Sequence, residues 1–145
     1  MAFDAEYEPS PWEPIAEQVE LYERTGGAEG NDFMGGPCII LTSVGAKSGK
    51  LRKTPLIRVT DGTSYVVIGS MGGAPTNPQW VHNLRANSAV QLQDGPTVYE
   101  LIAREVEGDE KATWWRLATE VWPDYDTYQS STDRVIPLFV LEPKG

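Results

Sequence analysis

The chain has 145 residues, a formal net charge of -9, 40% hydrophobic residues and a single cysteine. This length suits one domain (1–145) with its own core, the apolar content excludes a disordered chain, and one cysteine excludes an intramolecular disulfide framework. Because no run approaches the roughly 18 apolar residues of a membrane span and the acidic N-terminus lacks signal-peptide features, we expect a cytoplasmic protein without a transmembrane segment.

Charge is unevenly distributed along the chain. Between Phe33 and Gln93 there are six Lys or Arg residues and one acid, a net +5, whereas the remaining segments carry a net -14. A positive centre in a negative chain predicts a local site for a small anion. Nucleic acid is not an expected partner, because the acidic remainder would repel a long polyanion.

The first predicted element is an amphipathic helix. Ser10 is expected to be its N-cap, with Pro11 at the first helical position, and Gly26 and Gly27 end it. Its apolar positions recur at helical spacing: Trp12, Ile15, Val19 and Tyr22. Four glutamates on the other faces favour a helix packed on its own domain over one lying on a membrane.

The rest of the chain alternates strand-like runs with two helices. The predicted strands are Cys38–Val44, Lys50–Thr60, Ser64–Gly69, Val90–Asp94, Thr97–Val106 and Ile136–Leu141, with a tight turn at Asp61-Gly62. Helices are expected from an Asn77 cap to Ala86 and from Asp109 to Val121. This pattern predicts the α+β class, with residues 1–35 forming a helix and connecting loop and 36–145 a small antiparallel barrel.

The stretch GAKSGKLRKTP, Gly45 to Pro55, holds four cations and no acid. Its glycines allow a close backbone approach to a ligand, and arginine can hold a phosphate with two parallel hydrogen bonds. It is neither a Walker-A loop nor a dinucleotide fingerprint. A phosphate site and a solvated hairpin protected by lysines both fit the pattern.

The stretch IGSMGGAPTNPQWVHNL, Ile68 to Leu84, runs from a strand through small residues into a helix. Small residues admit a flat ring and a helix start favours anions. Trp80 fits a core position as well as a stacking surface, and Asn83 fits a loop cap as well as a ligand contact. His82 is the sole histidine, and with one cysteine it cannot form a usual zinc site, so no metal is expected.

The stretch WPDYDTYQSSTDR contains Trp122, Tyr125 and Tyr128, which share one face if this segment is helical. Aromatic walls with two phenols can enclose a planar substrate and donate hydrogen bonds to it. A local ion pair between Asp133 and Arg134 is expected to hold this segment in place.

Together, these three stretches resemble the deazaflavin-dependent nitroreductases of actinobacteria, over about Gly36 to Pro143. The resemblance implies a split β-barrel related to FMN-binding oxidoreductases. It also implies coenzyme F420, an 8-hydroxy-5-deazaflavin, as the cofactor.

The resemblance also implies site residues. The cofactor's phosphate and glutamate tail would meet Ala46, Lys47, Ser48 and Arg52, and its side chain would run along Lys53, Thr54, Pro55, Leu56 and Ile57. The ring would contact Ile68, Gly69, Ser70, Met71, Gln79, Trp80, Val81, His82, Asn83 and Tyr125. Ile57, Trp122, Tyr125 and Tyr128 would form the substrate side, with Ser70, Tyr125 and Tyr128 as catalytic residues.

The implied reaction is hydride transfer from the reduced deazaflavin to a hydrophobic planar acceptor such as a quinone or nitroaromatic. Three residues depart from the family pattern: Met71 replaces a frequent lysine, Trp122 a tyrosine and Ile57 an aromatic residue. An FMN-dependent reductase, a non-catalytic deazaflavin-binding protein and a plain interaction domain are the alternatives. Monomer and dimer both remain open.

Overall fold

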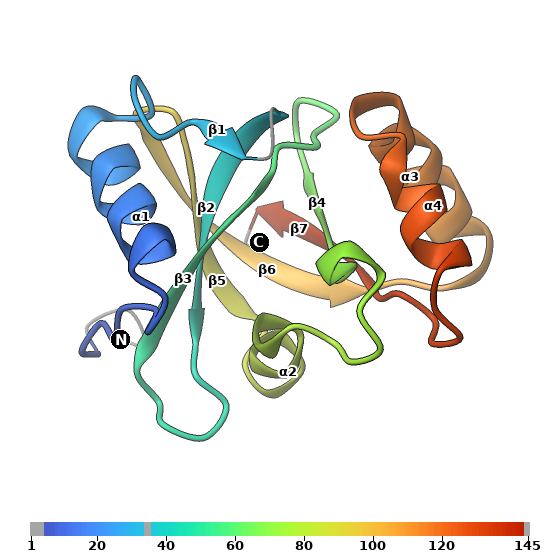
Figure 1. Cartoon of the computed structure of the whole chain (residues 1–145), viewed down its shortest axis with the longest axis horizontal. Helices are drawn as coiled ribbons and strands as arrows, with labels where there is room; N and C mark the ends of the chain where they lie inside the picture. The colour runs from blue at the N-terminus through green and yellow to red at the C-terminus, as the bar shows by residue number, and fades with distance from the viewer. Residues whose placement is uncertain (1–4, 34–35, 144–145) are drawn as a thin grey trace.

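The computed structural model describes residues 5–33 and 36–143, which form a strongly curled antiparallel sheet with helices around it (Figure 1). The sheet has seven strands in the order β1-β2-β5-β6-β7-β4, and β3 pairs with the other edge of β2. The strands are β1 (Asp32–Phe33), β2 (Gly36–Val44), β3 (Leu51–Ile57), β4 (Tyr65–Ile68), β5 (Ala89–Asp94), β6 (Thr97–Glu105) and β7 (Leu138–Pro143).

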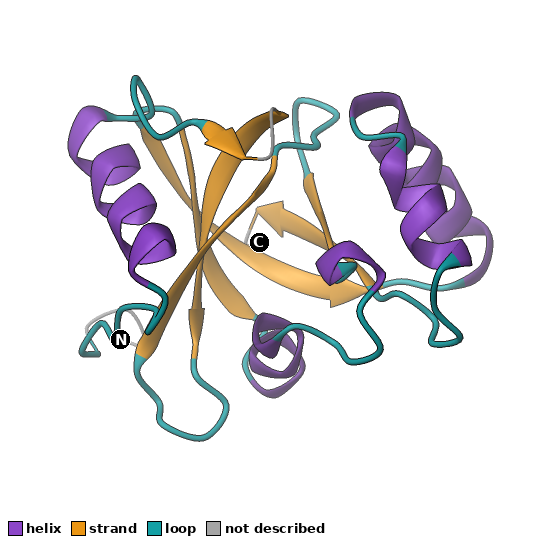
Figure 2. Ribbon diagram, viewed as in Figure 1, coloured by secondary structure: helices purple, strands orange, loops and turns teal. Residues whose placement is uncertain are grey.

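The helices stand on different sides of this sheet (Figure 2). Helix α1 (Glu13–Thr25) lies on one side, and α3 (Gly108–Val121) and α4 (Asp124–Ser130) lie together on the opposite side. Helix α2 (Gln79–Ala86) and the short 3-10 helix η2 (Met71–Gly73) lie between them. No described helix is long and apolar enough to cross a membrane.

The structure confirms the α+β class and all six predicted strands, with small shifts at their ends, and adds the short β1. Two predicted helix caps are wrong. Helix α1 begins at Glu13, and the Ser10 hydroxyl accepts a hydrogen bond from the Trp12 amide (3.1 Å) without capping the helix. Trp12 is 65% exposed, because it precedes the helix and so lies off its buried face.

The second wrong cap is Asn77. Helix α2 starts after Pro78 with no side-chain cap, and the Asn77 amide oxygen accepts a hydrogen bond from Arg134 at 2.7 Å. The sequence predicted that this oxygen would accept from the first amides of the helix, but the charged Arg134 side chain binds it instead.

The segment after β3 confirms the predicted tight turn at Asp61-Gly62, since Thr60 and Tyr65 form an antiparallel bridge and the Val66 amide donates to the Val59 carbonyl at 3.0 Å. β3 ends at Ile57, since the next residue, Arg58, faces Pro37, which has no amide hydrogen to continue the ladder. The chain then turns at Asp61, whose carboxylate accepts hydrogen bonds from the amides of Thr63 (2.9 Å) and Ser64 (2.8 Å). Beyond this short hairpin, β4 forms its ladder with β7.

The alternation of side chains along the strands divides the core into separate clusters. On β4, Tyr65 and Val67 face an inner cluster that receives Trp80, Val81 and Leu84 from α2. Val66 and Ile68 face the opposite way, into the cluster under α3 and α4. Since successive residues of a strand point to opposite faces, one short strand connects both clusters.

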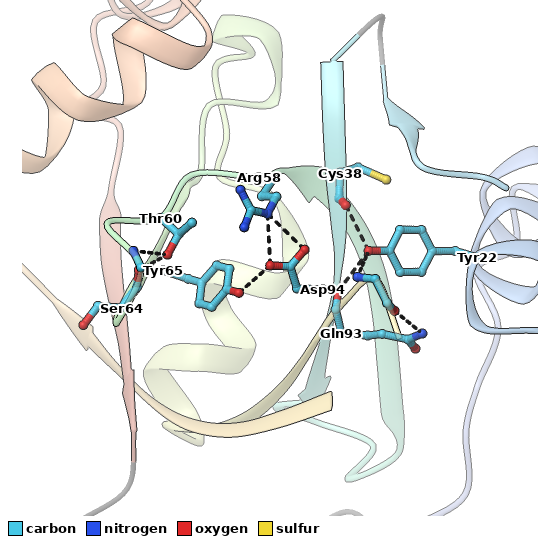
Figure 3. Close-up of polar contacts among 10 residues, drawn as sticks. Tyr22, Cys38, Arg58, Thr60, Ser64, Tyr65, Gln93 and Asp94 are labelled. Carbon is cyan, nitrogen blue, oxygen red and sulfur yellow. Dashed lines mark hydrogen bonds and ion pairs between the residues drawn. The ribbon is translucent and has the colours of Figure 1, made fainter. Parts of the chain in front are cut away.

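A polar network fastens the rim of the sheet (Figure 3). Arg58 Nε donates to both carboxylate oxygens of Asp94 (3.0 Å each), and the Tyr65 hydroxyl donates to the same carboxylate. On the α1 side, the Tyr22 hydroxyl donates to the Cys38 carbonyl (3.1 Å) and accepts from the Gly95 amide (2.7 Å). These contacts join α1, β2 and the β5–β6 turn.

Candidate functional site

A cavity of about 520 Å³ opens between β3, η2, α2 and α4. Most of its walls are apolar, which suits a flat organic ligand, and the volume lies within the usual range for small-molecule sites. It is lined by Ile15, Thr54, Pro55, Leu56, Ile57, Ile68, Ser70, Met71, Gly72, Pro78, Gln79, Trp80, Trp122, Tyr125 and Tyr128.

The floor of the cavity depends on a sharp turn at the end of β4. Gly69 fits there because a Cβ would lie 2.7 Å from Val81 Cγ2 and 3.1 Å from Pro137. Ser70 follows, 7% exposed and facing the cavity. Met71 then has a φ of 45°, a left-handed conformation that is unfavourable for a residue with a side chain. The turn is therefore held in place by its surroundings.

Arg134 provides much of that support. Its guanidinium donates to the carbonyl of Ser70, the carbonyl of Ala74 and the amide oxygen of Asn77, each at 2.7 Å. The predicted ion pair with Asp133 is therefore wrong. The two side chains are adjacent in sequence, but the fold directs Arg134 toward three oxygens of the 70–77 loop. Partial burial lowers the pKa of Arg134, and the three acceptors satisfy one N–H donor on each of its three nitrogens.

The aromatic wall confirms the predicted grouping of Trp122, Tyr125 and Tyr128. Tyr125 and Tyr128 meet edge to face with ring centroids 6.2 Å apart, and Trp122 Nε1 donates to the Tyr128 hydroxyl at 3.3 Å. Burial raises the pKa of Tyr125 above its usual range, with a smaller contribution from Tyr128. Tyr125 is therefore a neutral phenol at physiological pH and a hydrogen-bond donor.

The predicted tail-binding residues lie outside the cavity, along the 45–50 loop and the start of β3. Ala46, Lys47 and Ser48 are exposed, and the Ala46 amide donates to the buried Asn83 side chain at 2.9 Å. Asn83 therefore holds the 45–50 loop in place, which confirms the prediction that it caps a loop. Lys47 makes no ion pair with any residue in the ranges 5–33 and 36–143.

The other basic side chains already have acidic partners within the chain. Arg52 Nη1 lies 2.9 Å from Glu8, and Lys53 Nζ lies 2.5 Å from Glu23. These pairs reduce the positive potential that the sequence suggested for this region, because each cation is partly neutralised by a neighbouring carboxylate.

The remaining predicted ring contacts divide by burial. Val81 and Asn83 are buried in the interior, while His82 is exposed on α2, so these three side chains do not line the cavity. Gly69 supports the wall without contributing to it. Twelve predicted residues do line the cavity: Thr54, Pro55, Leu56, Ile57, Ile68, Ser70, Met71, Gln79, Trp80, Trp122, Tyr125 and Tyr128.

Three lining residues were not predicted: Ile15, Gly72 and Pro78. The sequence indicated that Ile15 would be buried, because it lies on the apolar stripe of α1. The stripe did not indicate which element Ile15 would face. Gly72 and Pro78 lie within the Ile68–Leu84 stretch, and they line the cavity because the loop between β4 and α2 passes along it.

Comparisons with known proteins place this chain among relatives of described function. The model of the F420H(2)-dependent quinone reductase family matches residues 15–143. An F420H(2)-dependent quinone reductase of Mycobacterium tuberculosis H37Rv is 36% identical over 125 residues, which is 83% of this chain and 84% of the relative.

Two solved structures are similar in fold and sequence. An F420-H2 dependent reductase (FDR-A) is 47% identical with a TM-score of 0.69, covering 73% of this chain and 94% of that one. A structure described as a domain-swapped dimer is 43% identical with a TM-score of 0.73, covering 92% of this chain and all of the other.

Proposed function

Because the chain belongs to the F420H(2)-dependent quinone reductase family, we propose that its cavity holds the deazaflavin ring beside a quinone acceptor. Family membership confirms the predicted resemblance, the split β-barrel fold, the oxidoreductase class and coenzyme F420 as cofactor. It favours F420 over the FMN alternative. When bound in reduced form, the coenzyme supplies a hydride.

The residues present fit a flat, mostly apolar group. Pro55, Leu56, Ile57 and Ile68 offer apolar surface from two strands, and Trp80 closes the cavity from α2. Trp80 is only 5% exposed and packs edge to face on Phe139, so its position is fixed from behind. A rigid wall orients a bound ring at low entropic cost.

The observation that carries the proposal is the pair of phenols, Tyr125 and Tyr128, in the same apolar cavity as Ser70. A quinone develops negative charge on its oxygens as it accepts a hydride, and a neutral donor aimed at that charge lowers the barrier. Tyr125 remains protonated because of its burial. Tyr128 accepts from Trp122, which leaves its own proton free for the acceptor.

The test measures oxidation of reduced F420 with a soluble quinone for the wild type, Tyr125→Phe and Tyr128→Phe. Loss of a donor directed at the developing charge lowers kcat by about 10²-fold. Tyr99→Phe is the control, since Tyr99 is 41% exposed on β6 and does not line the cavity. Unchanged rates in both cavity variants, or no quinone reduction by the wild type, would contradict the proposal.

Two finer expectations stay proposals. The cytoplasm remains the proposed location on the basis of the single cysteine, Cys38, which is buried. Both a monomer and a dimer fit this chain, and one similar structure is described as a domain-swapped dimer.

A further inference from the structure

An acidic segment of the chain itself covers the basic start of β3. Residues 5–9, the acidic strap, run beside β3 and form a parallel bridge between Tyr7 and Leu51. The Leu51 amide donates to the Glu6 carbonyl (2.8 Å), and the Glu8 amide donates to the Leu51 carbonyl (2.9 Å). In Figure 1 the coloured chain that precedes α1 lies beside the start of β3. The strap therefore adds a short strand to the free edge of β3.

The side chains of the strap neutralise the cations of that edge. Glu8 pairs with Arg52 at 2.9 Å and Glu6 with Lys50 at 3.6 Å. The Tyr7 ring lies under the Lys53 ammonium, 4.9 Å from ring centroid to Nζ. Three of the four cations in the Gly45–Pro55 stretch thus contact the strap.

These cations continue the wall of the cavity. Residues 54 to 57 of β3 all line the cavity, and Lys53 and Arg52 are the next residues toward the start of the strand. An anionic group that leaves the cavity along β3 therefore passes Lys53 and Arg52. The Glu8 carboxylate already pairs with Arg52 there.

We propose that Glu6 and Glu8 are specificity-determining residues that compete with the anionic tail of the deazaflavin for Arg52 and Lys50. The inference rests on the proposed function. A tail of phosphate and glutamate units presents the same acceptor oxygens as the strap. The strap thereby lowers the advantage of a long tail over a short one, and a bound tail displaces it.

The strap is held weakly enough for this exchange. In the described ranges its backbone makes two hydrogen bonds to β3, and the Glu6 and Glu8 side chains are 76% and 44% exposed. Ion pairs at such exposure change an equilibrium by about fivefold at most. A polyanionic tail with several carboxylates exceeds that.

The test titrates the intact protein, by fluorescence, with long-tailed F420 and with the deazaflavin chromophore that lacks phosphate and glutamates. The variants are Glu6→Gln/Glu8→Gln and a control with the same charge change, Glu29→Gln/Glu100→Gln. Both control residues are exposed and make no ion pair within residues 5–33 and 36–143.

The strap variant should bind long-tailed F420 about two- to fivefold more tightly at low salt, with unchanged affinity for the tail-less chromophore. Equal effects of both double variants, or an equal shift for both ligands, would overturn the competition. If the wild type binds neither ligand, the proposed function fails and the competition with it. Binding of both ligands without a strap effect overturns the competition alone.

A second readout follows the strap directly. Hydrogen exchange at the Glu8 and Leu51 amides should accelerate when long-tailed F420 is added, because both amides lose their partners when the strap leaves. The tail-less chromophore should leave both rates unchanged. Slower or constant exchange with the long-tailed form would show that the strap stays in place, which contradicts displacement.

Discussion

Replacing Arg134 by methionine tests whether this side chain holds the 70–77 loop in its cavity-forming shape. The variant retains most of the aliphatic stem and removes three hydrogen bonds, each 2.7 Å long, to Ser70, Ala74 and Asn77. Hydrogen bonds from a charged donor contribute about 1.5–3 kcal/mol each. Because the Arg134 side chain is partly exposed, we expect a loss of about 2–4 kcal/mol in the free energy of unfolding, less than the sum of three such bonds.

Urea denaturation followed by tryptophan fluorescence measures this loss, and for a chain of this size it corresponds to about 6–15 °C in Tm. Arg134→Lys keeps the charge but cannot reach all three oxygens, so its loss should be smaller. Arg116→Met is the control, since that side chain is exposed on α3 and makes no hydrogen bond in the described ranges.

Arg134→Met should also weaken F420 binding, because Ser70 and Met71 line the cavity and their turn contains a left-handed residue. If Arg134→Met and Arg116→Met unfold at the same urea concentration, Arg134 does not support the loop. If stability falls but the affinity for F420 is unchanged, the shape of the cavity does not depend on it.

Two further predictions concern the rest of the fold. Gly27→Ala should reduce the free energy of unfolding by about 1–3 kcal/mol more than Gly49→Ala. Both glycines have a left-handed φ, but a Cβ at Gly27 would lie 2.7 Å from Gly95 Cα, whereas a Cβ at Gly49 would face open space. Equal urea midpoints for the two variants would contradict this. Burial, and then the hydrogen bond to Asp94, raise the pKa of Tyr65, so its contribution to stability is complete below about pH 10 and is lost as pH rises further. Tyr65→Phe should therefore flatten the decline of the free energy of unfolding at alkaline pH. Parallel curves of stability against pH for the wild type and the variant would refute the assignment.

Local sequence determined most of the secondary structure. Apolar and β-branched runs predicted six of the strands, and the apolar stripe of α1 ended at Gly26, whose left-handed φ of 62° closes the helix. The grouping of Tyr125 and Tyr128 was also predictable from their helical spacing, whereas Trp122 precedes α4 and joins them through the path of the chain between α3 and α4.

Only the tertiary structure decided which charged and polar side chains meet. Arg134 makes no ion pair with the adjacent Asp133 and donates instead to oxygens of residues 70–77. Arg52 pairs with Glu8, which is far away in the sequence. The physical reason is that hydrophobic periodicity reports which face of an element is buried, while an ion pair depends on where two distant elements place their side chains. The sequence alone therefore specified the elements and the cavity's aromatic wall, and the folded chain specified what occupies its basic edge.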